Sequence, residues 1–189
     1  MSIENRQLRT ALDAFLRRHP EDRQRLDRVR EILDLAGTSP TSRKEFRGHV
    51  TAGAVVTDDR GRVLRIHHRG LNAWLFPGGH LEASDSGLVD AALRELCEET
   101  GVTPGSVTVV DEVPLDIDVH TIPENPERGE PEHPHFDFRY LLRTCSPTLA
   151  LQREEVTDAR WCPVQDVTDR RLRERIQAAL EHPKDSARR

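Results

Sequence analysis

One stretch of the chain, residues 76–102, combines a glycine turn, a short acidic loop and a segment that carries many carboxylates. Apolar residues in its second half recur at the spacing of a buried helical face: Leu88, Val89, Ala92, Leu93 and Leu96. Ser86 is a good N-cap residue, and Gly101 suits the left-handed position just past a helix end. The pattern therefore predicts a helix that starts after Ser86, ends at Thr100 and packs one face into the core.

Beside this apolar face, Glu95, Glu98 and Glu99 stand at positions i, i+3 and i+4. Three like charges then lie within about one helical turn, where each pair repels by a few tenths of a kcal/mol. Arg94 offsets only part of that charge. An isolated group of glutamates on a helix is most often a solvated face. A divalent cation would also neutralise it, and an all-oxygen donor set suits Mg²⁺ or Mn²⁺.

These residues, in this order, resemble the Nudix box, G-x5-E-x7-R-E-U-x-E-E-x-G-U, where U is a bulky aliphatic residue. The run RELCEETGV, residues 94–102, matches every specified position of the second half. The first half begins at Gly79 and differs in two respects. Asp85 stands where the family has Glu, and eight residues, not seven, separate it from Arg94. We interpret this as an acidic substitution plus one inserted residue, which leaves the metal-binding half intact.

The resemblance implies an α/β Nudix fold, an α/β/α sandwich with a mixed sheet. It also implies Mg²⁺- or Mn²⁺-dependent hydrolysis of a small-molecule substrate, a nucleoside diphosphate linked to a moiety X. The implied metal ligands are Glu95, Glu98, Glu99 and the Gly79 carbonyl oxygen. Glu98, Glu95 and Arg94 are the catalytic candidates, with Arg94 orienting a glutamate. The general base stays open between Glu98 and two carboxylates that precede the last expected strand, Glu154 and Glu155.

The rest of the pattern predicts three parts: an N-terminal helical extension and linker (1–42), a Nudix domain (43–182) and a polar tail (183–189). In the extension, a second helix is expected to open at Pro20. Its apolar positions are spaced for burial: Leu26, Val29, Ile32, Leu33 and Leu35. The two helices are candidates for a cover on the domain or for a homodimer contact.

Residues 133–142 alternate as a half-buried strand does. Phe136, Phe138, Tyr140 and Leu142 fall on one face, and the other face carries four polar side chains: His133, His135, Asp137 and Arg139. Three roles are open for this polar face. It contacts the substrate, it binds a transition metal through its alternating side chains, or it faces water. Substrate binding is the role we assign to it, together with the Pro- and acid-rich loop at 122–134.

The composition of the chain limits the classes of partner that it is expected to bind. The formal net charge of −5 and a sequence pI of about 6.0 leave no basic footprint for duplex nucleic acid. The polar start MSIENRQLRT and the lack of a long apolar run predict a cytoplasmic protein without membrane contact. The three cysteines are odd in number and far apart, which favours reduced core thiols.

Three other interpretations compete with the nucleotide hydrolase. Isoprenoid diphosphate isomerases share the fold, but they use a cysteine in a context that this chain lacks, since no cysteine precedes Cys97. A ligand-sensing domain with an inactive box would have lost its metal glutamates, which are all present here. A hydrolase of a non-nucleotide diphosphate is a variant of the main hypothesis.

Overall fold

The computed structural model describes residues 3–145, 149–151 and 154–182. The tail predicted at 183–189 lies outside these residues. The helical elements are α1 (Asn5–Arg18), η1 (Pro20–Asp22), α2 (Asp27–Asp34), α3 (Leu88–Thr100), η2 (Pro104–Ser106), η3 (Pro126–Arg128), η4 (Val164–Asp166) and α4 (Arg170–Glu181). The strands are β1 (His49–Thr57), β2 (Arg62–His68), β3 (Ala73–Leu75), β4 (Gly78–His80), β5 (Val107–Val109), β6 (Asp116–Ile122), β7 (His133–Thr144) and β8 (Val156–Pro163).

The eight strands form one mixed sheet, as predicted. Its central path is β3-β2-β1-β7-β5, with β4 paired to β1, β6 to β7 and β8 to β2. The central pair, β1 and β7, is parallel, and the other pairs are antiparallel. Most of β1 is buried on both faces, which fits its position in the middle of the sheet.

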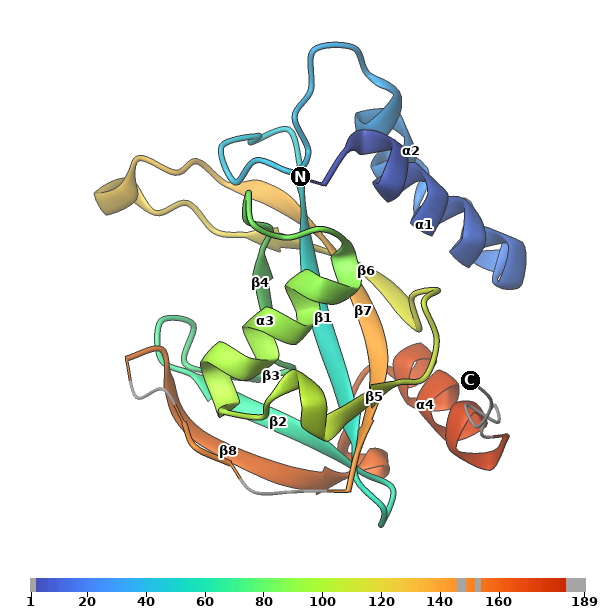
Figure 1. Ribbon diagram of the computed structural model, residues 1–189. Coiled ribbons are helices and arrows are strands. Elements are labelled where there is room, and N and C mark those ends of the chain that lie inside the picture. Colours follow the sequence, from blue (N-terminus) through green and yellow to red (C-terminus); the bar gives the residue numbers. More distant parts are fainter. Residues whose placement is uncertain (1–2, 146–148, 152–153, 183–189) are drawn as a thin grey trace.

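Helices cover both faces of this sheet (Figure 1). Ala54 and Val56 of β1 pack with Leu96 of α3 on one face. The intervening residue Val55 packs with Ile176 of α4 on the other face. Because successive residues of a strand point to opposite sides, α3 and α4 lie on opposite faces. The α/β/α sandwich is confirmed.

The N-terminal extension shares its core with the sheet. Leu8 and Phe15 of α1 are fully buried in one apolar cluster with Phe136 and Phe138 of β7. The predicted second helix differs in detail, since Pro20 opens only the short η1 and α2 begins at Asp27. Leu35 is 48% exposed, contrary to the expectation of burial, because α2 ends at the preceding residue.

Two other local expectations need correction. Ser86 is not the N-cap of α3, because Gly87 occupies that position without a side-chain cap and the Ser86 hydroxyl bonds to Asp90. Gly101 does end the helix in the left-handed conformation, with φ of 70°. All three cysteines are free, but Cys97 is partly exposed and Cys145 is exposed, so only Cys162 is a buried thiol. Within the described part of the chain, no helix is both long and apolar enough to cross a membrane.

An ionic network joins the extension to the C-terminal helix around the sheet edge at β6. The carboxylate of Asp22 is 3% exposed and accepts hydrogen bonds from Arg25 and Arg175. Arg175, on α4, also bonds to Asp116 of β6. Burial alone would raise the pKa of Asp22, but the bonds from Arg25 and Arg175 outweigh it and lower that pKa to about 2.

We predict that Asp22→Asn lowers the free energy of unfolding near neutral pH. A pKa of about 2 against the ordinary 3.8 corresponds to about 2 kcal/mol. Because the folded-state pKa is depressed, this contribution is complete above the ordinary pKa and is lost as pH falls from 3.8 toward 2. Urea unfolding of both proteins at several pH values should therefore give a difference that shrinks on acidification.

The matched control is Asp27→Asn, because Asp27 pairs with Arg30 at a half-exposed position. Such pairs contribute at most about 1 kcal/mol. If the difference in the free energy of unfolding between wild type and Asp22→Asn stayed constant across the acid range, it would contradict the lowered pKa of Asp22 in the folded state.

Candidate active site

Two glycines of β4 bring the sheet close to α3. Gly78 has φ of 157°, and a Cβ there would lie 2.7 Å from the Gly53 Cα atom. At Gly79 a Cβ would lie 2.6 Å from Oε1 of Glu95. The Glu95 carboxylate thus occupies the space that any side chain at 79 would fill, which explains the need for glycine at this point.

The three box carboxylates, Glu95, Glu98 and Glu99, differ in their access to water. Glu99 is 3% exposed, and its Oε2 accepts a hydrogen bond from the Gly78 backbone N–H at 2.9 Å. The side chain of Glu95 is 13% exposed and that of Glu98 is 49% exposed. The three carboxylates therefore range from Glu99, which is buried beneath the glycine turn, to Glu98, which an incoming molecule can reach.

Arg94 forms hydrogen bonds to two of these carboxylates. It donates from Nη1 to Glu95 Oε1 at 2.9 Å and to Glu98 Oε2 at 3.1 Å. It also donates from Nε and Nη2 to the two oxygens of Asp85, at 2.9 and 3.0 Å, and to the His80 carbonyl at 2.8 Å. The bidentate bond to Asp85 is the main reason that the pKa of Arg94 is raised. Asp85, the residue that departs from the family pattern, thus fixes Arg94.

The charge on the box carboxylates is incompletely compensated. Burial raises the pKa of Glu95 despite its bond to Arg94, and it raises that of Glu99 to about 8. The Glu155 charge adds to both shifts, which indicates that Glu155 lies near the box carboxylates. Two converging carboxylates beside the backbone of Gly79 form an all-oxygen donor set, so these residues fit a hard divalent cation.

The polar face of β7 is buried, so the water-facing interpretation of His133 and His135 is wrong. They are 4% and 9% exposed, and the alternate residues Phe136 and Phe138 lie in the core on the other face, as predicted. Arg139 donates to Asp137 at 2.8 Å and to Asp118 at 2.9 Å.

Arg139 therefore has partners within the protein. A third carboxylate, that of Asp116, lies 3.7 Å from it, and the Phe76 ring centroid lies 6.0 Å away. These carboxylates, led by the Asp137 charge, outweigh burial and raise the pKa of Arg139. Contact of Arg139, His133, His135 and Asp137 with substrate stays a prediction, and a phosphate would have to compete with these carboxylates for Arg139.

Sequence reasoning missed several residues of this polar face. His49 pairs with His135 in the parallel β1–β7 ladder, and His120 pairs with His135 from β6. His80 of β4 lies opposite Thr51, whose hydroxyl donates to Asp137 at 3.1 Å. His49 opens β1, and His80 and His120 lie at or near the ends of β4 and β6, so their convergence depends on strand pairing that local sequence does not reveal.

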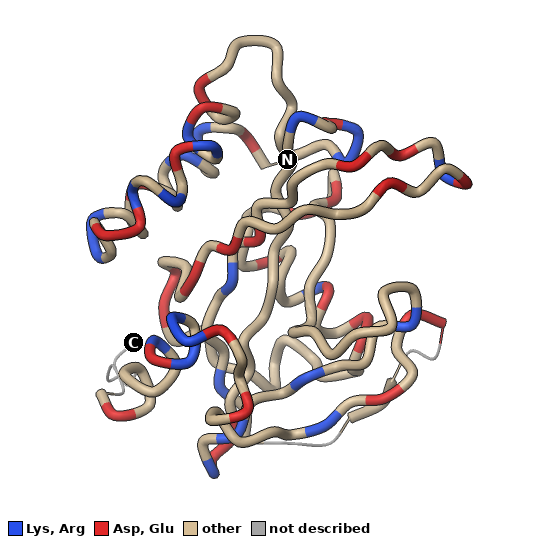
Figure 2. Tube along the Cα trace, turned by 180° about the vertical axis from the view of Figure 1, so that it is seen from behind, with Lys and Arg blue, Asp and Glu red and all other residues tan. Residues whose placement is uncertain are grey.

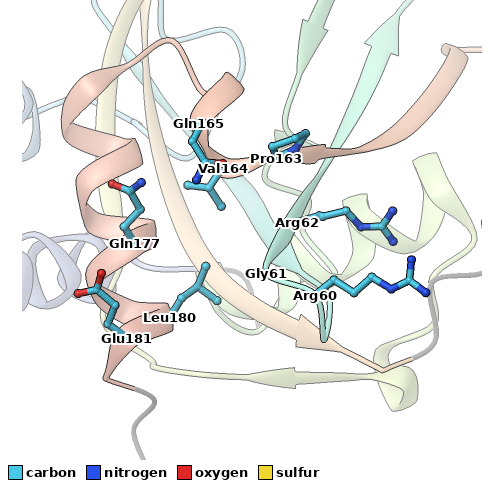
Figure 3. Close-up of a pocket in the computed structure, with 9 residues that line it drawn as sticks. All are labelled: Arg60, Gly61, Arg62, Pro163, Val164, Gln165, Gln177, Leu180 and Glu181. Atoms are coloured by element: carbon cyan, nitrogen blue, oxygen red, sulfur yellow. The ribbon is translucent and has the colours of Figure 1, made fainter.

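Two hollows open on the described surface. One, of about 330 Å³, lies between β2, β8 and α4 and contains no box residue; Figure 3 shows its lining residues, among them Arg62, Gln165 and Gln177. The other, of about 650 Å³, is lined by Arg69, Leu149, Ala150, Leu151, Val156 and Thr157. The Arg69 backbone N–H donates to the Glu155 carbonyl at 2.8 Å. The second hollow thus adjoins Glu155, whereas the first is remote from the candidate chemistry.

Comparison with known proteins agrees with this geometry. The family model described as NUDIX domain matches residues 47–182. The chain belongs to the Nudix family. A Nudix-family relative of Lactococcus lactis, named "Probable DHNTP pyrophosphohydrolase", is 31% identical over 128 residues, covering 65% of this chain and 70% of the relative.

Two further matches are informative. An RNA pyrophosphohydrolase of Halorhodospira halophila is 45% identical over 65 residues, which is 34% of each chain. The crystal structure of a Caenorhabditis elegans Ap4A hydrolase binary complex superposes with a TM-score of 0.56 at 19% identity, over 70% of this chain and 97% of that one. The last match shows the fold alone. The family and its named members identify this Nudix protein as a hydrolase.

We predict that Gly79→Ala weakens Mn²⁺ binding with little loss of stability. The added Cβ displaces only the end of the Glu95 side chain, so the free energy of unfolding should fall by less than about 1 kcal/mol. Displacing a carboxylate ligand should lower the Mn²⁺ affinity at least about tenfold. Calorimetric titration and urea unfolding measure the two effects.

Gly78→Ala is the contrasting variant. Its Cβ meets backbone atoms of Ala52 and Gly53, and its φ of 157° is strained for any other residue, so stability itself should fall by about 1–3 kcal/mol. Unchanged Mn²⁺ affinity in a folded Gly79→Ala protein would remove Gly79 and Glu95 from the metal site.

Proposed function

We propose that this chain is a Mg²⁺-dependent Nudix pyrophosphohydrolase that cleaves a nucleoside diphosphate linked to a moiety X. The observation that carries the proposal is the convergence of Glu95 and Glu99 on the Gly78–Gly79 turn, held by the Arg94–Asp85 pair. A merely solvated glutamate face would not bury two of its carboxylates against backbone. This arrangement supports the metal ligands Glu95, Glu98, Glu99 and the Gly79 carbonyl oxygen.

The bound cation, Mg²⁺ or Mn²⁺, would neutralise phosphate charge and acidify a water molecule. The chain's own residues position the carboxylates that would take part in this chemistry. Arg94 fixes the directions of the Glu95 and Glu98 carboxylates through its hydrogen bonds, and Asp85 fixes Arg94. Glu98, half exposed, is the most accessible of the three box carboxylates.

For the general base we favour Glu155. It is exposed, and its charge is among the main influences on the pKa values of both Glu95 and Glu99. An exposed carboxylate at the edge of a metal site is free to accept a proton from water and release it to solvent. Glu98 remains the alternative within the box.

The hollow of about 650 Å³ beside Glu155 is our candidate place for part of the substrate. Its size falls in the range of small-molecule pockets, about 300–1,000 Å³. The relatives named for DHNTP and RNA support a phosphorylated nucleotide or pterin-like compound. A non-nucleotide diphosphate is the second candidate.

The pairing of arginines in the N-terminal extension argues against a nucleic-acid-binding role for it. Figure 2 shows acidic and basic residues alternating along α1, η1 and α2. Arg28 pairs with Glu31, and Arg18 pairs with Asp111 outside the extension. We therefore favour turnover over ligand sensing, in a cytoplasmic enzyme. A homodimer through these helices would use only their outer faces, since the apolar faces are buried against the sheet.

We predict that Glu98→Gln lowers kcat by orders of magnitude in Mg²⁺ while the thermal unfolding midpoint changes little, because the residue is half exposed. Phosphate release is measured on a panel of DHNTP, nucleoside triphosphates, dinucleoside polyphosphates, ADP-ribose, nucleotide sugars and isoprenoid diphosphates. Activity within a few-fold of wild type, at saturating Mg²⁺, would exclude Glu98 from the site.

The general base is tested by a matched pair of neighbouring substitutions. Glu155→Gln should lower kcat by about 10²–10⁴, the usual contribution of a general base, and should remove the acidic limb of the pH–rate profile. Glu154→Gln should leave both unchanged. The reverse outcome would assign the base to Glu154, and two inactive or two active variants would return the role to Glu98.

A further inference from the structure

Five of the nine histidines of this chain gather at one end of the sheet, away from the box carboxylates. This histidine cluster consists of His49, His80, His120, His133 and His135. Six pairs of its rings have centroids 4.4–5.6 Å apart. They come from four strands, β1, β4, β6 and β7, so the sheet itself brings them together. So many imidazoles in contact call for an explanation beyond packing.

The central members, His49 and His135, are buried, and one ring nitrogen of each is unsatisfied among the described residues. His49 is fully buried, and His135 is 9% exposed. Within the described part of the chain, Nε2 of each has no hydrogen-bond partner. Leaving a buried polar atom unsatisfied is unfavourable, and native proteins rarely do so without a functional reason. Two such atoms in adjacent rings therefore point to a ligand that accepts nitrogen lone pairs.

Backbone carbonyls already orient two of the rings. His49 Nδ1 lies 3.3 Å from the Glu45 carbonyl oxygen, and His133 Nδ1 lies 2.6 Å from the Pro131 carbonyl oxygen. A carbonyl only accepts, so each Nδ1 carries the proton and donates it, which leaves Nε2 with a free lone pair. A ring that is fixed in this way by a carbonyl is the usual arrangement of a metal-binding histidine.

The protonation state of these histidines agrees with metal binding. Burial lowers the pKa of His49 to about 4, and burial together with the neighbouring histidines lowers that of His135 to about 2. Both imidazoles are therefore neutral at physiological pH, the form that binds metals.

We propose that His49, His133 and His135 bind one borderline transition-metal ion of the Zn²⁺ type, at a site separate from the box. One ring nitrogen from each lies within 4.8 Å of the other two. Zn–N bonds of about 2.0–2.1 Å place ligand nitrogens about 3.4 Å apart, so each ring needs to move by less than about 1 Å. His80 stands beside the three, with its ring centroid 5.1 Å from that of His49.

The donor set also determines which ions are excluded. Two carboxylates on this face are engaged, since Asp137 and Asp118 accept from Arg139 and Asp118 also lies 3.1 Å from His120 Nδ1. The three donors are thus neutral nitrogens, which suit Zn²⁺, Ni²⁺ or Cu²⁺ and not Mg²⁺. The two sites would therefore select different ions.

The position of the ligands indicates what the ion would do. The connection between β6 and β7, residues 123–132, forms an arm that extends from the body of the protein (Figure 1), and His133 is the first residue of β7 after it. His49 opens the central strand β1. An ion held by both would fasten the base of the arm to the middle of the sheet, and binding to the folded state alone would stabilise the protein.

The test uses the full chain after removal of metals by a chelator, with millimolar Mg²⁺ present to fill oxygen sites. Calorimetry should show one equivalent of Zn²⁺ bound, with a rise in the thermal unfolding midpoint. X-ray absorption of the Zn²⁺ form should show nitrogen neighbours at about 2.0–2.1 Å with the outer-shell pattern of imidazole. An oxygen-only shell, or no bound Zn²⁺, would overturn the proposal.

Variants then locate the site. His133→Gln and His135→Gln should each weaken Zn²⁺ binding at least about tenfold. The control His182→Gln, at an exposed position after α4, should bind as wild type does. Circular dichroism of the metal-free proteins checks that each variant folds. Equal Zn²⁺ affinity in folded His133→Gln and wild type would overturn the assignment, and the absorption spectrum of wild type decides the matter if a variant does not fold.

Discussion

The negative charge that α3 carries against β4 is the constraint on which the rest of this site depends. Glu99 is buried under the Gly78 N–H, and Glu95 occupies the space beside Gly79. Glu95 could not take this position if β4 carried a side chain at 79, and a side chain at 78 would meet the β1 backbone at Ala52 and Gly53. One arginine, Arg94, contacts two box carboxylates and is itself held by Asp85, so a net negative charge remains. A cation is the physical complement of that arrangement.

The sheet edge at β6 shows how the same protein surrounds buried carboxylates with arginines. Asp116 is 2% exposed and contacts Arg175 and Arg139. Arg25 and Arg175 hold the pKa of Asp22 low, whereas burial outweighs the arginine contacts of Asp116 and raises its pKa. This network links η1, β6 and α4, and with the apolar contacts of α1 it makes the N-terminal extension a structural part of the domain. Asp22 thus differs from Glu95 and Glu99, whose pKa values are raised by burial.

Local patterns predicted the parts of the structure that local interactions determine. The spacing of apolar residues gave the extent of α3 to within about one residue at its start, and the alternation of β7 gave both of its faces. The Nudix box gave the mixed sheet. Two expectations failed for local reasons. The end of α2 at Asp34 leaves Leu35 exposed, and Ser86 bonds to Asp90 instead of capping the helix. The histidine cluster needed the parallel pairing of β1 with β7, which no local pattern reveals.

The two candidate metal sites meet at β4. Gly79 faces α3 and pairs with Ala52, whereas the next residue, His80, pairs with Thr51 and turns its ring toward the histidine cluster. Because successive residues of a strand point to opposite faces, one short strand separates an oxygen site from a nitrogen site. The backbone also joins them, since Arg94 donates to the His80 carbonyl at 2.8 Å. A shift of β4 caused by an ion among the histidines would thus act on Arg94 and, through it, on the direction of the box carboxylates.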